Sequence, residues 1–257
     1  MFKDKRYIIV MLFFTVIFSF TIKPRIASAE IYSSSPKFDF VALGDSLAAG
    51  QTPECTFDKS YTTYIEDKLK EKRVLGDFNN FAVSGYKTSD VLKKLQDPTQ
   101  LNIIKNAEII TLDVGANDLL SYISPSMANS TDNLALAEII ATITKEVPQN
   151  IITIIAEIRE VNPTAKIYVM GYYNSFPYLS SPLQDQALYF IQALNNSIKT
   201  TTESCGATYV STEEVMNKQL TEYIPNPADI HPSLLGYQAI AKEFLKIIEV
   251  DFRLVQN

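Results

Sequence analysis

The hydrophobic positions after residue 36 fall into two kinds of stretch, short apolar runs and longer segments with helical spacing. Short apolar runs that end at Gly, Asn or Ser are typical of buried strands. Such runs predict five strands, at residues 38–43, 77–83, 107–114, 166–170 and 207–210.

Between these runs, apolar residues recur every three or four positions, which is the spacing of helices that bury one face. The predicted helices cover residues 58–72, 88–98, 131–161, 183–202 and 233–250. Pro148 lies inside the longest of them. Because a proline removes a backbone donor, we expect a kink or a division into two helices there.

Strands and helices that alternate in this order predict a parallel sheet with helices on both faces. We therefore expect an α/β protein with three layers (α/β/α), built on a five-stranded parallel sheet. The chain has no internal repeat and no low-complexity tract. Its length fits one domain, which we place at residues 30–257.

The first 29 residues have a pattern of their own. Three basic residues precede the apolar stretch Tyr7–Ile22, and small residues follow at Ala27 and Ala29. This is the pattern of a cleaved secretory signal peptide. The stretch is shorter than the roughly 20 residues that span a bilayer, and an uncleaved anchor is the alternative. We expect cleavage after Ala29, a secreted, extracellular protein and no stable membrane span afterwards.

Composition narrows the classes of partner. Apolar residues make up 46% of the chain, which is enough for a sizeable core. Without residues 1–29, 18 basic and 28 acidic residues remain, a formal net charge of −10. Such a charge disfavours nucleic acids and anionic membranes as partners. We expect a monomer that binds no nucleic acid.

Cysteine and histidine are scarce. Cys55 and Cys205 are the only cysteines, and they follow the first predicted strand and precede the last. Those positions lie at opposite ends of a parallel sheet, which favours two free thiols. The chain has one histidine, so no Cys/His cluster has the spacing of a metal site, and we expect no metal.

Polar residues follow the carboxyl ends of the predicted strands. Ser46, Gly85 and Asn117 follow the first three strands, and His231 precedes the last helix. The carboxyl ends of parallel strands lie at one edge of the sheet, so we expect these residues to meet there. A histidine can activate a serine as a nucleophile. Backbone N–H groups at Ser46 and Gly85 and the Asn117 amide could hold an oxyanion, although each residue alone is also an ordinary turn or cap residue.

These residues lie in sequence blocks that resemble the SGNH/GDSL hydrolase family of esterases and lipases. The blocks are Phe40–Leu47 (FVALGDSL), Asn80–Gly85 (NFAVSG), Gly115–Asp118 (GAND) and His231-Pro232. The resemblance spans residues 38 to about 245. It implies a flavodoxin-like SGNH hydrolase fold, Ser46 as nucleophile, His231 as base, and oxyanion donors at Ser46, Gly85 and Asn117. It implies no cofactor.

One departure from the family pattern concerns the group that orients His231. The family commonly has an Asp three residues before the histidine, where this chain has Ala228, and Asp229 lies two residues before it. Either Asp229 or a main-chain carbonyl orients the ring, and the second case leaves a Ser–His dyad. We expect Asp229 to be the third catalytic residue.

The resemblance implies a serine hydrolase that cleaves carboxylic esters through an acyl-enzyme on Ser46, and the predicted signal peptide adds that it is secreted. Tyr172, Tyr173 and Phe176 follow the fourth strand and could line a substrate groove. We expect lipase-like or lysophospholipase-like activity on a small-molecule or lipid ester, and the alternative is an acetylesterase acting on carbohydrate or cell wall. A third alternative, outside the enzymes, is a non-catalytic binding protein on a degenerate hydrolase scaffold. Ala228 supports this alternative, because it stands where the family commonly has its catalytic acid.

Overall fold

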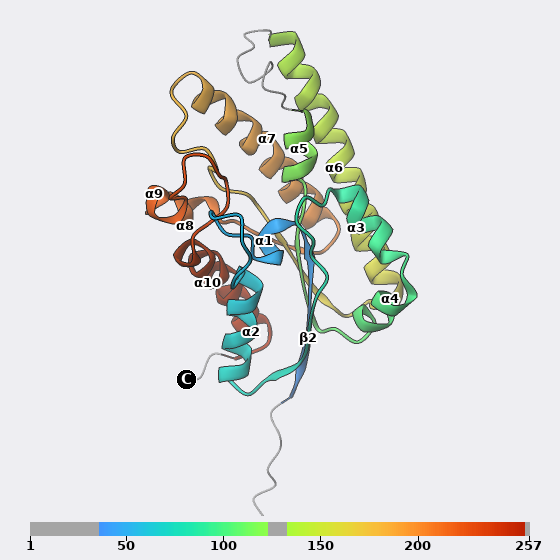
Figure 1. Cartoon of the computed structure of the whole chain (residues 1–257). Coiled ribbons are helices and arrows are strands. Elements are labelled where there is room, and N and C mark those ends of the chain that lie inside the picture. The colour runs from blue at the N-terminus through green and yellow to red at the C-terminus, as the bar shows by residue number, and fades with distance from the viewer. Residues whose placement is uncertain (1–35, 123–132, 255–257) are drawn as a thin grey trace, which may run out of the picture. The chain divides into compact units, whose positions relative to one another are not determined.

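The computed structural model describes residues 36–122 and 133–254, so the predicted signal peptide lies outside the described residues. A parallel sheet of five strands forms the middle layer, in the spatial order β2-β1-β3-β4-β5 (Figure 1). The strands are β1 (Phe38–Gly44), β2 (Leu75–Asn80), β3 (Ile109–Asp113), β4 (Lys166–Met170) and β5 (Thr208–Val210).

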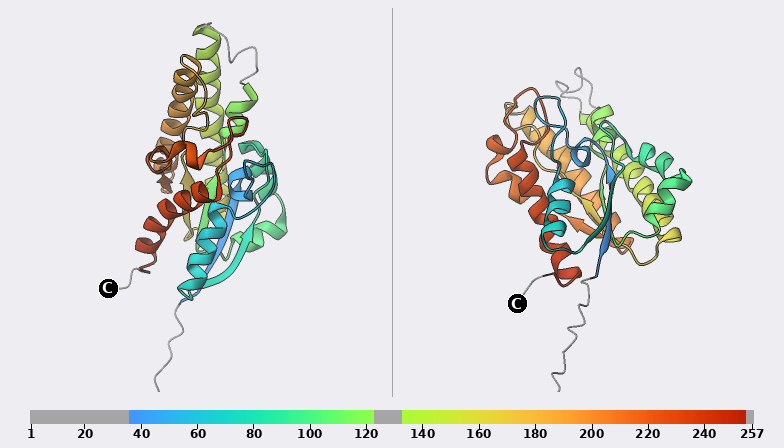
Figure 2. Two further views of the ribbon diagram at one scale, coloured as in Figure 1. Left: turned by 60° about the vertical axis from the view of Figure 1, so that its left-hand side comes forward. Right: turned by 60° about the horizontal axis from the view of Figure 1, so that its bottom comes forward.

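Helices cover both faces of this sheet, which confirms the predicted three-layer α/β/α fold. Helices α2 and α10 pack together on one side, and α3, α4 and α6 lie on the other (Figure 1). Figure 2 shows the sheet between these layers from two further sides, with α6 and α7 side by side. The helices are α1 (Ser46–Ala49), α2 (Tyr61–Glu71), α3 (Thr88–Leu95), α4 (Pro98–Ile104), α5 (Ala116–Tyr122), α6 (Asn133–Val161), α7 (Leu183–Ser204), α8 (Glu213–Asn217), α9 (Leu220–Tyr223) and α10 (Leu234–Asp251).

The central strands are apolar almost throughout because helices cover both of their faces. All five residues of β3 are buried, as are the last five of β1 and the last four of β4. These strands carry the polar turns at their carboxyl ends. Packing of the core therefore holds the carboxyl ends of these strands in place, and the predicted site residues lie in the loops that follow them.

Strand β2 differs from its prediction at residues 77–83, because it begins at Leu75 and ends at Asn80. It is an edge strand with no fully buried residue, so its apolar pattern is weak. The apolar residues Phe81 and Val83 lie in the following loop, where their N–H groups donate to carbonyls of β1. They continue beside β1 after the regular strand has ended.

Of the two outcomes expected at Pro148, a kink or a division, the division is wrong, because α6 is one helix of 29 residues with Pro148 inside it. Buried residues flank the proline on both sides, at Val147 and Ile151. Their packing outweighs the single backbone hydrogen bond that proline removes. Pro98, which was expected to end a helix, instead begins α4 after the N-cap Asp97.

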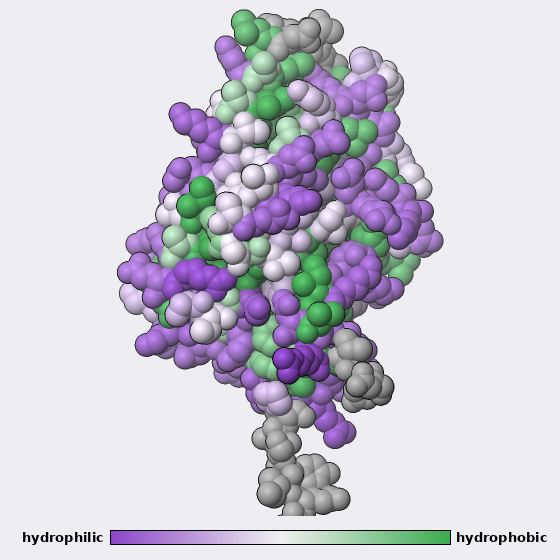
Figure 3. Space-filling model, turned by 180° about the vertical axis from the view of Figure 1, so that it is seen from behind, coloured by the Kyte–Doolittle hydropathy of each residue, from purple (hydrophilic) through white to green (hydrophobic). Residues whose placement is uncertain are grey.

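The described residues belong to one compact unit, Ser35–Asn257. Cys55 and Cys205 are free thiols, in agreement with the sequence expectation. In the part of the chain that the structure describes, no helix is long and apolar enough to cross a membrane. Hydrophilic residues predominate on the face drawn in Figure 3, and hydrophobic ones lie in separate patches.

Candidate active site

Ser46 begins α1 directly after β1, and the turn around it is held by hydrogen bonds. Asp45 is the N-cap, and its Oδ1 accepts the N–H of Leu47 at 3.0 Å. The backbone N–H of Ser46 itself has no hydrogen-bond partner within residues 36–122 and 133–254. The Ser46 side chain is largely buried, with 8% of the residue exposed.

His231 and Asp229 lie in the loop before α10. His231 Nε2 is 2.9 Å from Ser46 Oγ, and His231 Nδ1 is 2.6 Å from Asp229 Oδ1. The same Asp229 oxygen accepts the backbone N–H of His231 at 2.8 Å. The structure thus brings together the three residues that the sequence analysis expected to be catalytic, and the acid two residues before His231 reaches the ring.

Asn117 is the second residue of α5. Its Nδ2 donates to the carbonyl oxygen of Tyr86 at 3.0 Å, which fixes the amide and leaves its second hydrogen available. Gly85 precedes Tyr86 and has a φ of +84°, a conformation that favours glycine. A Cβ there would have nothing within 4 Å. The backbone conformation, rather than space, therefore explains the glycine.

A small cavity of about 20 Å³ lies at these residues, and Ser46, Asn117 and His231 all line it. Gly85 does not line it, so the structure places Gly85 only beside the site, through its neighbour Tyr86. A second cavity of about 30 Å³ adjoins the first and shares part of its lining. The shared residues are Ala116, Leu120, Tyr172, Ser175 and Ile230.

The three aromatic residues predicted for substrate binding all line these cavities. Tyr172 lines both of them, Tyr173 lines the one at Ser46, and Phe176 lines the adjoining one. The Tyr172 hydroxyl donates to Asp45 Oδ2 at 3.1 Å, so this residue also supports the turn at Ser46. Sequence reasoning did not find Leu120, Ile191 and Leu194, which make the adjoining cavity apolar.

A buried acid lies behind the turn at Ser46, and the sequence analysis missed it. Asp113, the last residue of β3, is fully buried and accepts the Tyr61 hydroxyl at 2.6 Å. Burial, and then the neighbouring Asp45 carboxyl, raise the pKa of Asp113 well above its usual range. Burial also raises the pKa of Asp45. An aspartate at the end of a completely buried strand was the signal that could have pointed to it.

The loop after α1 contacts the loop that carries Asp229. The Cys55 thiol lies 3.8 Å from Asp229 Oδ2, and the Asn226 side chain donates to the carbonyl of Pro53 at 2.8 Å. On the other side of the site, Asp118 accepts the N–H and the hydroxyl of Thr88. Asp118 therefore ties α5 to α3.

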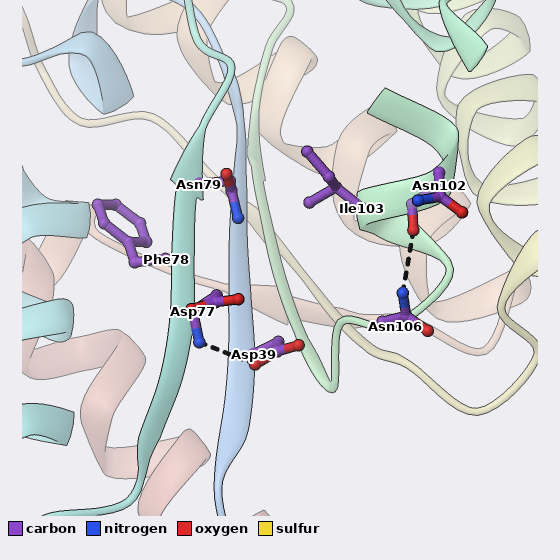
Figure 4. A pocket seen from close by; sticks show the side chains of 7 residues that line it. All are labelled: Asp39, Asp77, Phe78, Asn79, Asn102, Ile103 and Asn106. Carbon is purple, nitrogen blue, oxygen red and sulfur yellow. Dashed lines mark hydrogen bonds between the residues drawn. The ribbon is translucent and has the colours of Figure 1, made fainter. Parts of the chain in front are cut away.

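A larger hollow of about 320 Å³ lies between β2 and α4, apart from Ser46 (Figure 4). Its lining contains none of the predicted site residues and is mostly carboxylate and amide side chains, at Asp39, Asp77, Asn79, Asn102 and Asn106. Among the described residues, no group of three or more His, Cys, Asp or Glu side chains could hold a metal ion. The smaller cavity at Ser46 is the one that Ser46, Asn117 and His231 line together.

The chain is similar to known lipases and esterases in sequence and in fold. The chain matches the model of the GDSL-like Lipase/Acylhydrolase family over residues 42–239. It is 28% identical to the uncharacterized protein YpmR of Bacillus subtilis over 212 residues, which are 81% of this chain and 80% of YpmR. It is 26% identical to the spore germination lipase LipC of Bacillus licheniformis over 211 residues, 79% of this chain and 93% of LipC.

Two solved structures show the same fold. The lipase Lip_vut3 from a goat rumen metagenome has a TM-score of 0.68 at 23% identity, with 82% of this chain and 97% of that one covered. The acetylxylan esterase Axe2 of Geobacillus stearothermophilus has a TM-score of 0.59 at 17% identity, with 87% and 99% covered. The family match spans most of the chain and supports an ester hydrolase with a small-molecule ester as substrate. The chain therefore belongs to the GDSL-like lipase/acylhydrolase family.

Proposed function

We propose that this protein is a secreted serine hydrolase that cleaves carboxylic esters through an acyl-enzyme on Ser46. The observation that carries the proposal is the contact of Ser46 Oγ with His231 Nε2 at 2.9 Å, with Asp229 at the other ring nitrogen. A nucleophile within hydrogen-bond distance of a base, itself oriented by an acid, is the arrangement that serine hydrolases use.

In the proposed reaction, Ser46 Oγ attacks the ester carbonyl carbon while His231 Nε2 takes its proton. The negative oxygen of the tetrahedral intermediate accepts hydrogen bonds from the N–H of Ser46 and the amide of Asn117. The carbon–oxygen bond to the alcohol then breaks, and His231 returns its proton to the leaving alcohol. Water attacks the acyl-enzyme by the same route, and Asp229 stabilises the imidazolium in both steps.

The lining of the adjoining cavity supports an ester with an apolar acyl group. Leu120, Ile191 and Leu194 face this cavity, and Phe176 closes part of it. Apolar lining favours a hydrocarbon chain over a sugar, because burial of methylene groups stabilises the complex. The likeness to a spore germination lipase agrees with a lipase-like or lysophospholipase-like substrate.

The size of the cavities favours a second candidate, an acetylesterase. The cavities of about 20 and 30 Å³ each have roughly the volume of one water molecule. An acetyl group needs little additional space beside Ser46, whereas a long chain needs Phe176 or its neighbours to shift much further. The two candidates therefore differ in the acyl-chain length that they prefer.

One assay series tests the mechanism and separates the candidates. Purified protein lacking residues 1–29 is assayed on p-nitrophenyl esters from acetate to palmitate, with and without a phosphonate inhibitor, and any adduct is mapped by mass spectrometry. We expect turnover that the inhibitor abolishes, with its mass on the peptide that contains Ser46. A kcat/KM that rises beyond acetate supports the lipase-like substrate, and an optimum at acetate supports the acetylesterase.

The Ser46→Ala variant is the control for the mechanism. It removes the nucleophilic oxygen from a site whose turn is held by Asp45 and Asp113, so we expect it to fold and to lose acyl-enzyme formation. Full esterase activity in this variant contradicts the assignment of Ser46. Folded wild-type protein with neither turnover nor adduct supports the non-catalytic binding protein instead.

A further inference from the structure

Asp113 lies at the carboxyl end of β3, the middle strand of the sheet, and is completely buried. Removing a carboxyl group from water is costly unless it is paired or hydrogen-bonded. None of the described lysine, arginine or histidine side chains is hydrogen-bonded to it. An apolar residue at this position would avoid the free-energy cost of burying a carboxyl group. The contacts of Asp113 therefore need to explain why an aspartate is present.

The contacts of Asp113 converge on the turn that carries Ser46. Its Oδ2 accepts the backbone N–H of Ala48 at 3.1 Å and that of Asp45 at 3.3 Å. The Asp45 N–H also donates to the backbone carbonyl of Asp113 at 3.1 Å. Asp45 and Ala48 lie on either side of Ser46 in the sequence. One carboxyl oxygen therefore bridges the beginning and the end of the turn, while the other accepts the hydroxyl of Tyr61.

The glycine of the nucleophile motif makes room for this carboxyl group. A Cβ at Gly44 would lie 2.3 Å from Asp113 Oδ1, closer than real Cβ atoms approach a neighbour. Gly44 also has a φ of +152°, which disfavours other residues. The Asp113 carboxyl can therefore lie this close to the turn only because residue 44 is a glycine.

The bridge also decides which backbone amide stays free. The N–H of Leu47 donates to Asp45, and the N–H of Ala48 donates to Asp113. The N–H of Ser46 lies between them in sequence and has no partner within the described residues. A fixed, unpartnered N–H beside the nucleophile is what a developing oxyanion requires.

We propose that Asp113 is a positioning residue for the nucleophile, which bridges the amides of Asp45 and Ala48 so that Ser46 points its hydroxyl at His231 and keeps its N–H free. The inference rests on the proposed function, since it gives Asp113 a part in acyl transfer by Ser46. Asp113 touches none of the reacting atoms and acts through the backbone of the turn.

An asparagine should be able to replace Asp113 in this role. Burial raises the pKa of Asp113 well above its usual range, so a neutral side chain of the same shape is favoured at this position. A neutral carboxyl and an amide have the same shape, and each offers one acceptor oxygen and one donor group. The Asn oxygen can accept the two backbone amides, while its NH₂ group faces Tyr61.

The test compares Asp113→Asn with Asp113→Leu, which fills a similar space without an acceptor. The readouts are kcat and KM on p-nitrophenyl butyrate and the rate constant for phosphonylation of Ser46. We expect Asp113→Asn to stay near wild type. We expect Asp113→Leu to lose about 10- to 100-fold in kcat and in the phosphonylation rate with little change in KM, because a displacement of about 1 Å can cost this much.

Thr111→Val is the matched control, because Thr111 is a fully buried polar residue two positions earlier on the same strand. It should change the melting temperature only, with an unchanged phosphonylation rate. If Asp113 had a merely structural role, Asp113→Leu would also lower the melting temperature and leave the phosphonylation rate unchanged, provided that the rate is measured well below that temperature.

If folded Asp113→Leu has wild-type rates, the inference about Asp113 is overturned. The proposed function is then still supported, provided that Ser46→Ala is inactive. Absence of turnover and adduct in wild-type protein overturns both. If Asp113→Leu does not fold, Tyr61→Phe is the second variant, since it removes the hydroxyl that holds Asp113 Oδ1 in place and changes no residue of the turn itself. We then expect a phosphonylation rate lowered by about threefold or more, and an unchanged rate overturns the inference.

Discussion

At the scale of single residues, Asp229 contacts His231 across only two positions because it forms an Asx turn. Its Oδ1 accepts the backbone N–H of His231 and contacts Nδ1 of the same residue. Asx turns of this kind are a common local conformation of aspartate. Ala228, where the family commonly has its acid, is exposed. The shift by one residue is therefore absorbed by the turn.

Asp229→Asn should keep this turn and lose most of the activity. An amide cannot stabilise the imidazolium and favours the wrong tautomer of the ring, so we expect kcat to fall by about 10³- to 10⁴-fold. Steady-state kinetics on a p-nitrophenyl ester measure the loss. Asp185→Asn, an exposed aspartate in the first turn of α7, is the matched control and should behave as wild type.

The double variant Ala228→Asp with Asp229→Ala tests the turn itself. An aspartate at the exposed position 228 faces solvent, so we expect no recovery over Asp229→Ala alone. Recovery of kcat to within about tenfold of wild type would show that the loop adapts and that the Asx turn is not required.

The buried carboxyl of Asp113 should make stability depend on pH. Its pKa is raised in the folded protein, so the unfolded chain releases this proton at lower pH than the folded one, above about pH 3.9. The contribution of Asp113 to the free energy of unfolding is therefore constant below that pH. It falls by about 1.4 kcal/mol for each pH unit as the pH rises towards the pKa of the folded protein. Asp113→Asn has no such proton to lose.

The melting temperatures of wild type and Asp113→Asn, measured from pH 4 to 8, check this prediction. Their difference should move in favour of the variant as the pH rises. The titratable groups that face Asp113 are Asp45, Tyr61, Tyr172, Tyr173 and Tyr237, and both proteins share them. The tyrosines stay neutral because burial raises each pKa. A difference that does not vary with pH contradicts a raised pKa for Asp113.

At the scale of elements, the sequence predicted strands where helices cover both faces of the sheet. The apolar run at residues 166–170 coincides with β4, and β1 and β3 lie within two residues of their predicted ends. The edge strand β2 was displaced, because half-exposed polar residues carry little periodic signal. Pro148 does not divide α6, because tertiary packing maintains a helix that local backbone chemistry opposes.

Pro148 should weaken α6, since its ring cannot donate to the carbonyl one turn earlier. Pro148→Ala restores that donor, and we expect it to stabilise the protein by about 1–3 kcal/mol. The measurement is the free energy of unfolding from urea denaturation. Gln149→Ala, at the adjacent exposed position, is the control for a gain in helix propensity alone. A lower stability in Pro148→Ala shows that the helix is already adapted to the proline.

At the scale of the whole molecule, the order of strands accounts for how much of the site could be predicted. Ser46, Asn117 and His231 follow separate elements, and parallel topology alone brings them to one edge. The support of Ser46 by Asp113 and Tyr61 depends on the register of β1 against β3 and on the packing of α2. The strand register and the helix packing depend on side-chain contacts between layers, and no local pattern in the sequence predicts them.

The expected export of the chain is a prediction at this scale. If residues 1–29 are a signal peptide, protein recovered from the culture medium should begin at Glu30, and N-terminal sequencing measures this directly. Ala29→Lys removes the small residue that signal peptidases require, so it should leave the precursor uncleaved. A mature chain that still begins with Met1 contradicts the prediction and favours an anchor.

The acid and the base of the candidate site lie within one loop, whereas the nucleophile lies 185 residues away in the sequence. The pair Asp229–His231 is thus a local conformation that survives as long as its own turn does. The contact with Ser46 depends on the whole sheet. Gradual heating should therefore separate nucleophile from base before it separates base from acid, and activity should be lost while the histidine is still held by its aspartate.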